Sequence, residues 1–219
     1  MLQEHSECLS LGASGECVNG ELSGNNIVRN LIILGNDKIA GVVSEQICRS
    51  ENCVVYIDRS TGFSRVLKLL KRRVISPILL AKMAVCEVLR KGRRPDVVFP
   101  SIRSNDDLLR AISVHKPDRL ILFRAGLIIN KSVIASGVPV FNIHAAIVPD
   151  YGGIGSIDKA IKDKAYDQYA SVHIVTTRID EGAVVDRISY KLNPEFSYCQ
   201  NEAVAYRAGQ QLLLRAIGV

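Results

Sequence analysis

Short apolar runs alternate with amphipathic segments along most of this chain, and no other feature limits its fold as strongly. Runs such as Arg119–Phe123 (RLILF) and Val138–His144 (VPVFNIH) have the length and composition of buried strands. Asn105–His115, in contrast, carries its apolar residues at helical spacing. Strands that alternate with helices predict an α/β fold, namely a Rossmann-like, mostly parallel sheet with helices on both faces.

The same patterns predict the remaining elements. Further strands are expected at 38–43, 54–57, 97–99, 171–175 and 183–188. Further helices are expected at 27–34, 61–74, 77–92, 130–136, 156–162 (capped by Ser156) and 202–217. Residues 1–22 are polar and rich in Gly and Ser, and 17–22 is their best, though poor, strand candidate. We expect one catalytic domain over 1–219, with a basic helical insertion at about 61–92.

The formal charge of +6 is confined to one segment. Residues 65–94 hold ten Lys and Arg against the single acid Glu87, whereas the other 189 residues hold 18 basic and 21 acidic groups. A solvated helix face is the favoured interpretation. Contact with RNA or a membrane surface, and guidance of an anionic substrate tail, stay open. Because no aromatic residues interleave the basic ones, nucleic acid is not the expected partner.

The N-terminus and the cysteines favour a cytoplasmic protein. Residues 1–20 have neither the basic nor the apolar region of a secretory signal, and no run of about 18 apolar residues predicts a membrane span. None of the six cysteines forms a C-x-x-C pair, so free thiols in a reducing compartment are expected. Neither a metal nor an oligomeric state is indicated, and a homodimer stays open.

Three polar residues are expected to converge at neighbouring strand ends. Period-2 alternation places Asn142 and His144 on one face of their strand, and Asp180 follows in a turn between two further strands. An amide N–H can stabilise an oxyanion, an imidazole can carry a proton or its charge, and a carboxylate can orient the imidazole and accept a proton from an amine. This set suits acyl transfer.

These residues resemble the catalytic domain of the 10-formyltetrahydrofolate-dependent formyltransferases, which act on glycinamide ribonucleotide, methionyl-tRNA and amino sugars. The similarity rests on Asn142-x-His144, a Pro-x-Tyr at 149–151, VHIV at 172–175 and I-D-x-G at 179–182. It implies a formyltransferase fold in which Asn142, His144 and Asp180 are catalytic. The implied formyl donor is 10-formyltetrahydrofolate, and the implied partner is a small-molecule amine acceptor. The implied cofactor contacts are Phe123, Gly126, Leu127, Ile128, Ile129, Thr176, Thr177 and Arg178, and the weaker acceptor contacts are Gly24, Asn25 and Tyr151.

The chain departs from the family pattern in three places. Gly152 stands where the family usually has Arg, the first strand before a Gly-rich loop is weak at 17–22, and no barrel domain for tRNA follows the last helix. Two alternatives to formyl transfer therefore stay open: a 10-formyltetrahydrofolate hydrolase, and a non-catalytic folate- or RNA-binding relative. Outside the family context, His144 would be a structural strand-end histidine, His173 a partly buried one, and Asp180 a turn residue.

Overall fold

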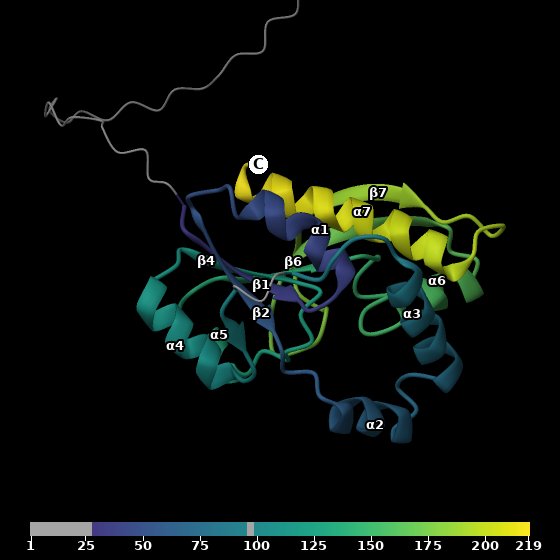
Figure 1. The fold of residues 1–219 in the computed structure, drawn as a ribbon, viewed down its shortest axis with the longest axis horizontal. Helices are drawn as coiled ribbons and strands as arrows, with labels where there is room; N and C mark the ends of the chain where they lie inside the picture. The colour runs from purple at the N-terminus through teal and green to yellow at the C-terminus, as the bar shows by residue number, and fades with distance from the viewer. Residues whose placement is uncertain (1–27, 96–98) are drawn as a thin grey trace, which may run out of the picture.

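The computed structural model describes residues 28–95 and 99–219, apart from the side chains of 63–65, and builds them around one seven-stranded sheet (Figure 1). The sheet order is β3-β2-β1-β4-β5-β6-β7, with β1 to β5 parallel and β6 and β7 antiparallel. The mostly parallel sheet is thus confirmed. The strands are β1 Asn30–Gly35, β2 Cys53–Asp58, β3 Ser101–Ile102, β4 Arg119–Phe123, β5 Val140–His144, β6 Asp167–Ile174 and β7 Val184–Lys191.

Helices cover both faces of the sheet, as the alternating pattern predicts. The helices are α1 Lys38–Ile47, α2 Phe63–Lys71, α3 Pro77–Leu89, α4 Asn105–His115, α5 Lys131–Ile134, α6 Ser156–Lys162 and α7 Tyr198–Ile217. One apolar cluster joins α1 and α7 to the sheet, and a second joins α4 and α5 to its other face (Figure 1). In the part of the chain described, no helix is long and apolar enough to cross a bilayer.

Two N-terminal predictions are wrong, because a strand and a helix exchange places. Residues 30–35 (NLIILG) form β1, all six of them buried, whereas a helix was expected at 27–34. Residues 38–47 form α1, whereas a strand was expected at 38–43; the Asp37 carboxylate caps this helix by accepting a hydrogen bond from the Ala40 N–H at 2.9 Å. Uninterrupted apolar residues fit a strand buried on both faces as well as a helix, so their periodicity could not decide.

Smaller predictions also need correction. Gly155, not Ser156, is the N-cap of α6. The strand expected at 97–99 falls mainly on residues outside the described part, and the short strand of this region is Ser101–Ile102. The strand candidate 17–22 and the substrate candidates Gly24 and Asn25 also lie outside the described residues. The weak first strand is no longer a departure, because Asn30–Gly35 fills that place.

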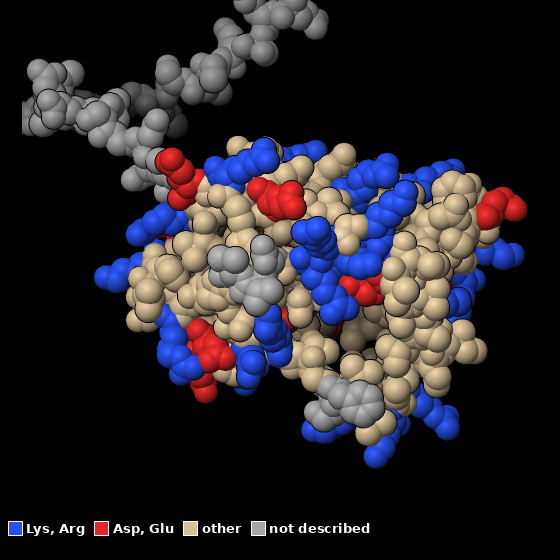
Figure 2. Space-filling view, in the orientation of Figure 1, with Lys and Arg blue, Asp and Glu red and all other residues tan. Residues whose placement is uncertain are grey.

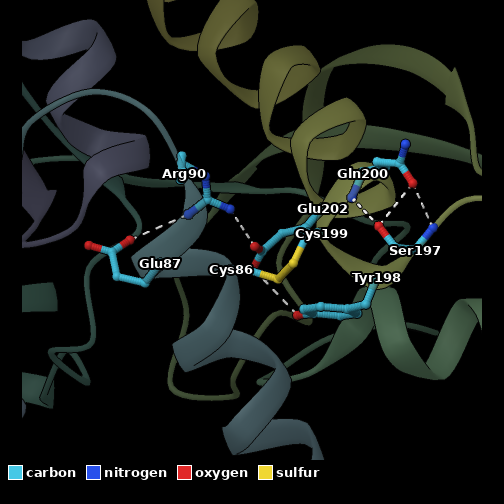
Figure 3. The surroundings of a disulfide bond; sticks show 8 residues. All are labelled: Cys86, Glu87, Arg90, Ser197, Tyr198, Cys199, Gln200 and Glu202. Atoms are coloured by element: carbon cyan, nitrogen blue, oxygen red, sulfur yellow. Dashed lines mark hydrogen bonds and ion pairs between the residues drawn. A yellow bond between two sulfur atoms is a disulfide. The ribbon is translucent and has the colours of Figure 1, made fainter.

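A disulfide joins Cys86 on α3 to Cys199 on α7 (Figure 3). The prediction of free thiols is therefore wrong for this pair, although Cys48 and Cys53 are free. The helices pack side by side and bring the two Cα atoms to 5.2 Å. Because 113 residues separate the two cysteines, the sequence does not show that they are neighbours. Arg90, one turn after Cys86, pairs with Glu202 of α7 and strengthens the junction. A cytoplasmic location stays a prediction.

Candidate active site

A cavity of about 490 Å³ opens at the carboxyl ends of β1, β2 and β4. From β1 the chain continues to β2 and β3 toward one edge of the sheet. It then crosses back to β4 on the opposite side of β1, so the strand order reverses between β1 and β4. Open α/β sheets bind ligands at such a point. The residues lining the cavity are Gly35, Asn36, Asp37, Asp58, Arg59, Thr61, Arg94, Arg124 and Gly126.

Asp58, the last residue of β2, holds the loop that follows β4. One of its carboxylate oxygens accepts hydrogen bonds from the N–H groups of Gly126 (2.5 Å) and Leu127 (2.8 Å). A Cβ at Gly126 would lie 2.3 Å from the Thr61 Oγ1, so only glycine fits there without rearrangement. Asp58 was missed by the sequence reasoning, and its position at the carboxyl end of a buried strand was the available signal.

Asn142, His144 and Asp180 come together beside these strand ends. The amide nitrogen of Asn142 lies 3.3 Å from the Asp180 Oδ1, and the Nδ1 of His144 lies 3.6 Å from the Asp180 Oδ2. The side chains of His144 and Asp180 are only 13% and 11% exposed, so water screens their interaction weakly. Asn142 and His144 both belong to β5, whereas Asp180 comes from the loop between β6 and β7.

The backbone fixes the Asp180 carboxylate. Asp180 adopts a left-handed conformation with φ of 54°, and its Oδ2 accepts the Gly153 N–H at 2.7 Å. Two residues later, a Cβ at Gly182 would lie 1.7 Å from the Ile174 carbonyl oxygen. The turn can therefore close only with glycine at 182, and this closure aims Asp180 back at β5.

The protonation states follow from the contacts. The Nε2 of His144 lies 2.8 Å from the Tyr151 carbonyl oxygen, which only accepts, so Nε2 carries the proton of the neutral ring. Burial lowers the pKa of His144 below its ordinary value, although Asp180 and the Tyr151 carbonyl favour the charged ring. Burial opposes ionisation of Asp180, yet contacts from His173, His144 and the Gly153 N–H outweigh it and hold the pKa of that carboxyl below its usual range.

His173 belongs to the same cluster, although the sequence favoured a purely structural role for it. It is 1% exposed, and its Nε2 lies 3.1 Å from the Asn142 Nδ2 and 3.3 Å from the Asp180 Oδ1. Its Nδ1 faces the Ile174 carbonyl oxygen at 3.3 Å. The missed signal was register, because His173 is the direct antiparallel partner of Asn142.

A side chain at position 152 would crowd Asp180. A Cβ there would lie 3.0 Å from the Asp180 Cβ and 3.3 Å from the Pro149 carbonyl oxygen. Glycine at position 152, where the family usually has Arg, therefore fits the local packing. It lets the backbone lie against Asp180, whose carboxylate accepts the N–H of the next residue, Gly153.

The remaining predicted contacts divide into accessible and buried residues. Phe123 is fully buried in the core and Ile129 is only 9% exposed. Ile128 is 57% exposed and Leu127 is half-buried. Thr176 and Arg178 bond to one another within an exposed turn beside the exposed Thr177. Tyr151 packs below Lys159, and its backbone carbonyl rather than its phenol meets His144.

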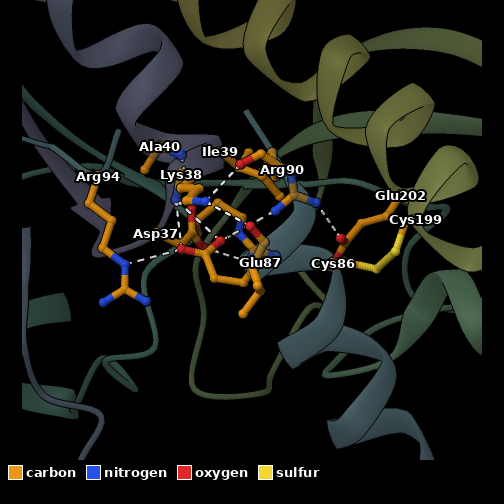
Figure 4. Close-up of polar contacts among 12 residues, drawn as sticks. Asp37, Lys38, Ile39, Ala40, Cys86, Glu87, Arg90, Arg94, Cys199 and Glu202 are labelled. Atoms are coloured by element: carbon orange, nitrogen blue, oxygen red, sulfur yellow. Dashed lines mark hydrogen bonds and ion pairs between the residues drawn. A yellow bond between two sulfur atoms is a disulfide. The ribbon is translucent and has the colours of Figure 1, made fainter. Parts of the chain in front are cut away.

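The N-terminus of α1 faces the cavity but already holds two carboxylates (Figure 4). Besides the Asp37 cap, the Glu87 carboxylate accepts the Lys38 N–H at 3.2 and 3.3 Å, and Arg90 and Arg94 hold Glu87 in place. Arg124 pairs with the second oxygen of Asp37. Among the described residues, no cluster of three or more His, Cys, Asp or Glu could hold a metal ion.

Comparison with known proteins connects this geometry to one family. The family model for formyl transferases matches residues 67–217. Methionyl-tRNA formyltransferase of Campylobacter jejuni is 25% identical over 117 residues, which are 53% of this chain and 38% of that protein. The enzyme of that name from Fervidobacterium nodosum is 25% identical over 108 residues, or 49% of this chain and 34% of its own. The matches thus span little more than a third of these relatives.

Solved structures show the same fold. Phosphoribosylglycinamide formyltransferase from Anaplasma phagocytophilum superposes with a TM-score of 0.61 at 12% identity, over 88% of this chain and 85% of that one. A formyltetrahydrofolate deformylase from Pseudomonas syringae gives 0.59 at 13% identity, over 88% and 61%. At such identities the likeness concerns the architecture of the sheet and its helices.

Proposed function

The chain belongs to the formyl transferase family, and from this premise we propose that it transfers the formyl group of 10-formyltetrahydrofolate to the amine of a small acceptor. The observation that carries the proposal is the convergence of Asn142 and His144 on Asp180, at 3.3 and 3.6 Å from its two carboxylate oxygens. This geometry agrees with the chemistry that the family implies.

The loops beside the cluster fit a folate donor. A flat pterin needs apolar walls and polar backbone groups at its edge. Leu127 and Val175 pack against one apolar cluster from two different loops and supply such walls, and the exposed turn 176–178 supplies backbone groups. The N–H groups of Gly126 and Leu127 are taken by Asp58, so that loop would contribute shape more than donors. When bound, the donor supplies the formyl carbon.

The His144–Asp180 pair can take up one proton. In the neutral ring the Nδ1 of His144 bears a lone pair that faces the Asp180 Oδ2 at 3.6 Å, so two acceptors confront each other. When the acceptor amine forms the new C–N bond, its nitrogen becomes acidic and gives a proton to this pair. The pair then returns the proton to the departing nitrogen as the old C–N bond breaks.

Asn142 would hold the negative charge that develops on the formyl oxygen. Its amide N–H, directed at Asp180 in this structure, donates to that oxygen during the reaction. The imidazolium formed at His144 adds a positive charge nearby, which is the electrostatic part of its predicted role. The Nε2 of His173 contacts both the Asn142 amide nitrogen and the Asp180 Oδ1, so His173 positions both groups.

The N-terminus of α1 bears on the class of acceptor, which is of the amino-sugar or the glycinamide ribonucleotide type. A phosphate is normally welcome at a helix N-terminus, where free N–H groups and the helix dipole attract anions. At α1 the Asp37 and Glu87 carboxylates already accept hydrogen bonds from those groups, so a phosphate would have to compete with them. We therefore expect an acceptor that does not place a phosphate at this helix.

The test is formyl transfer from 10-formyltetrahydrofolate to a panel of amino sugars by the wild type, Asn142→Ala and Asp180→Ala. Loss of one oxyanion donor costs about 10²–10³ in rate, so both variants should lose most turnover while donor binding persists. Asp167→Ala, which removes a carboxylate that is 88% exposed at the start of β6, is the matched control. Near-normal turnover in either site variant contradicts the roles, and cleavage of the donor at a useful rate without any amine favours a hydrolase.

A further inference from the structure

Helix α3 presents an apolar face to solvent. Ile78, Val85, Val88 and Leu89 are between 52% and 75% exposed, and they recur with Ala81 at spacings of three, four and one along the outer side of the helix. Only Leu79 and Cys86 of this 13-residue helix are buried. Figure 2 shows the corresponding broad area without charge over α3. Contiguous exposed apolar patches of this kind mark sites of interaction.

Basic side chains lie at both ends of this face. Lys68, Lys71, Arg72 and Arg73 precede α3 along the chain and Lys91 follows it, all five of them exposed. Within the described residues none of these five side chains makes an ion pair. Figure 2 shows blue side chains gathered around α2, next to the uncharged area. They are therefore available to a partner.

The face is held outward by contacts on the opposite side of α3. The Cys86–Cys199 disulfide and the Arg90–Glu202 pair fasten it to α7, and the Lys82 Nζ reaches the Asp158 Oδ1 of α6 at 2.9 Å. Lys38 of α1 donates to the carbonyls of Val88 and Arg90 at the end of the helix. Because these contacts fix its inner side, α3 cannot turn its apolar residues inward without breaking them.

We propose that α3, with the basic residues at its two ends, docks on an anionic lipid surface. Charge complementarity selects this occupant. A second copy of the chain would bring an identical segment with a charge of +9 against the first (ten basic residues and one acid at 65–94), which like-charge repulsion opposes. A nucleic acid would match the charge but would leave the apolar side chains in water, whereas an anionic bilayer interface satisfies both.

The expected contributions separate the two components of the surface. Each Lys or Arg near an anionic leaflet contributes about fivefold to binding, so replacing Lys71, Arg72 and Arg73 by Gln should weaken it about 100-fold. Burial of a single large apolar side chain contributes roughly tenfold or more, so Leu89→Asp should weaken binding by at least that factor. Salt should weaken the first component strongly, because it screens exposed charges.

The experiment is co-sedimentation of the full chain with two kinds of vesicle, phosphatidylcholine alone and equal parts of phosphatidylcholine and phosphatidylserine. We expect binding to the second kind only, lost in high salt, in Leu89→Asp and in the triple Gln variant. Val114→Asp is the matched apolar control, because Val114 is 73% exposed on α4. Lys116, Lys131 and Lys164, replaced together by Gln, are the charge control. Circular dichroism and the melting temperature establish that each variant is folded.

Three results would overturn the proposal. The first is failure of the full chain to bind either vesicle, which includes the case in which residues 1–27 cover the face instead. The second is equal binding to both vesicles, or equal loss in the control variants. The third is a dimer in sedimentation analysis that Leu89→Asp dissociates, which would assign the face to a second copy.

Discussion

Loss of the Cys86–Cys199 bridge should destabilise the protein substantially. The bridge closes a loop of 113 residues, and the loop-closure entropy removed from the unfolded chain corresponds to about 5 kcal/mol at 25 °C. Measured values usually fall between about 2 and 4 kcal/mol, because native strain and residual structure reduce the gain. We therefore expect Cys86→Ala/Cys199→Ala to lose at least 2 kcal/mol, which lowers the melting temperature by about 4 °C or more for a chain of this size.

The assay is denaturant unfolding of the wild type and the double variant, each with and without a reducing agent. Reduction should bring the wild type close to the double variant and should leave the variant unchanged. Cys48→Ser is the control, because Cys48 is exposed and free. Equal unfolding midpoints for wild type and double variant under oxidising conditions would refute the reasoning, and so would a reductant effect of the same size in the double variant.

Three further predictions concern the candidate site. The pKa of His144 is lowered in the folded protein, so on acidification the ring in the unfolded chain takes up a proton first. The stability should therefore fall as the pH drops below about 6.5, the ordinary pKa of histidine. In unfolding measured against pH, His144→Gln should reduce this loss of stability, and an unchanged slope would contradict the prediction. Gly152→Ala should displace Asp180 by a few tenths of an ångström and reduce turnover by less than the roughly 100-fold that a 1 Å misplacement costs, with an unchanged melting temperature; full activity would show that the neighbouring chain yields freely. Asp58→Ala removes the acceptor of three backbone N–H groups, those of Ser60, Gly126 and Leu127. It should cost about 3 kcal/mol of stability and raise the KM for the donor, whereas Asp58→Asn should recover part of both.

The sequence predicted the second half of the fold better than the first. Elements with one clear face, such as α4, were found because polar residues alternate with apolar ones along them. Residues 31–34 are all buried, and no polar residue among them distinguishes the two-residue repeat of a strand from the 3.6-residue repeat of a helix. Residues 38–43 look like a strand for the same reason, and only the Asp37 cap identifies a helix start.

The residues of the candidate site also differ in how far the sequence predicts them. Asn142 and His144 could be placed together because they share one strand, and Asp180 because the family spacing includes it. Asp58 and His173 could not, because their contacts depend on the strand order β2-β1-β4 and on antiparallel register. The disulfide was missed because helix packing across 113 residues leaves no local trace.

The antiparallel pairing of β6 and β7 also bears on the order in which the molecule folds. Residues 175–183 connect these strands, whereas residues 36–118 separate β1 from β4, a span roughly nine times as long. Closing the longer connection costs about 2 kcal/mol more in chain entropy. We therefore expect the hairpin that bears Asp180 to form early, and the pairing of β1 with β4, which completes the crevice, to form late. Conditions that slow this last pairing would therefore populate an intermediate in which the hairpin with Asp180 is formed but the binding crevice is not.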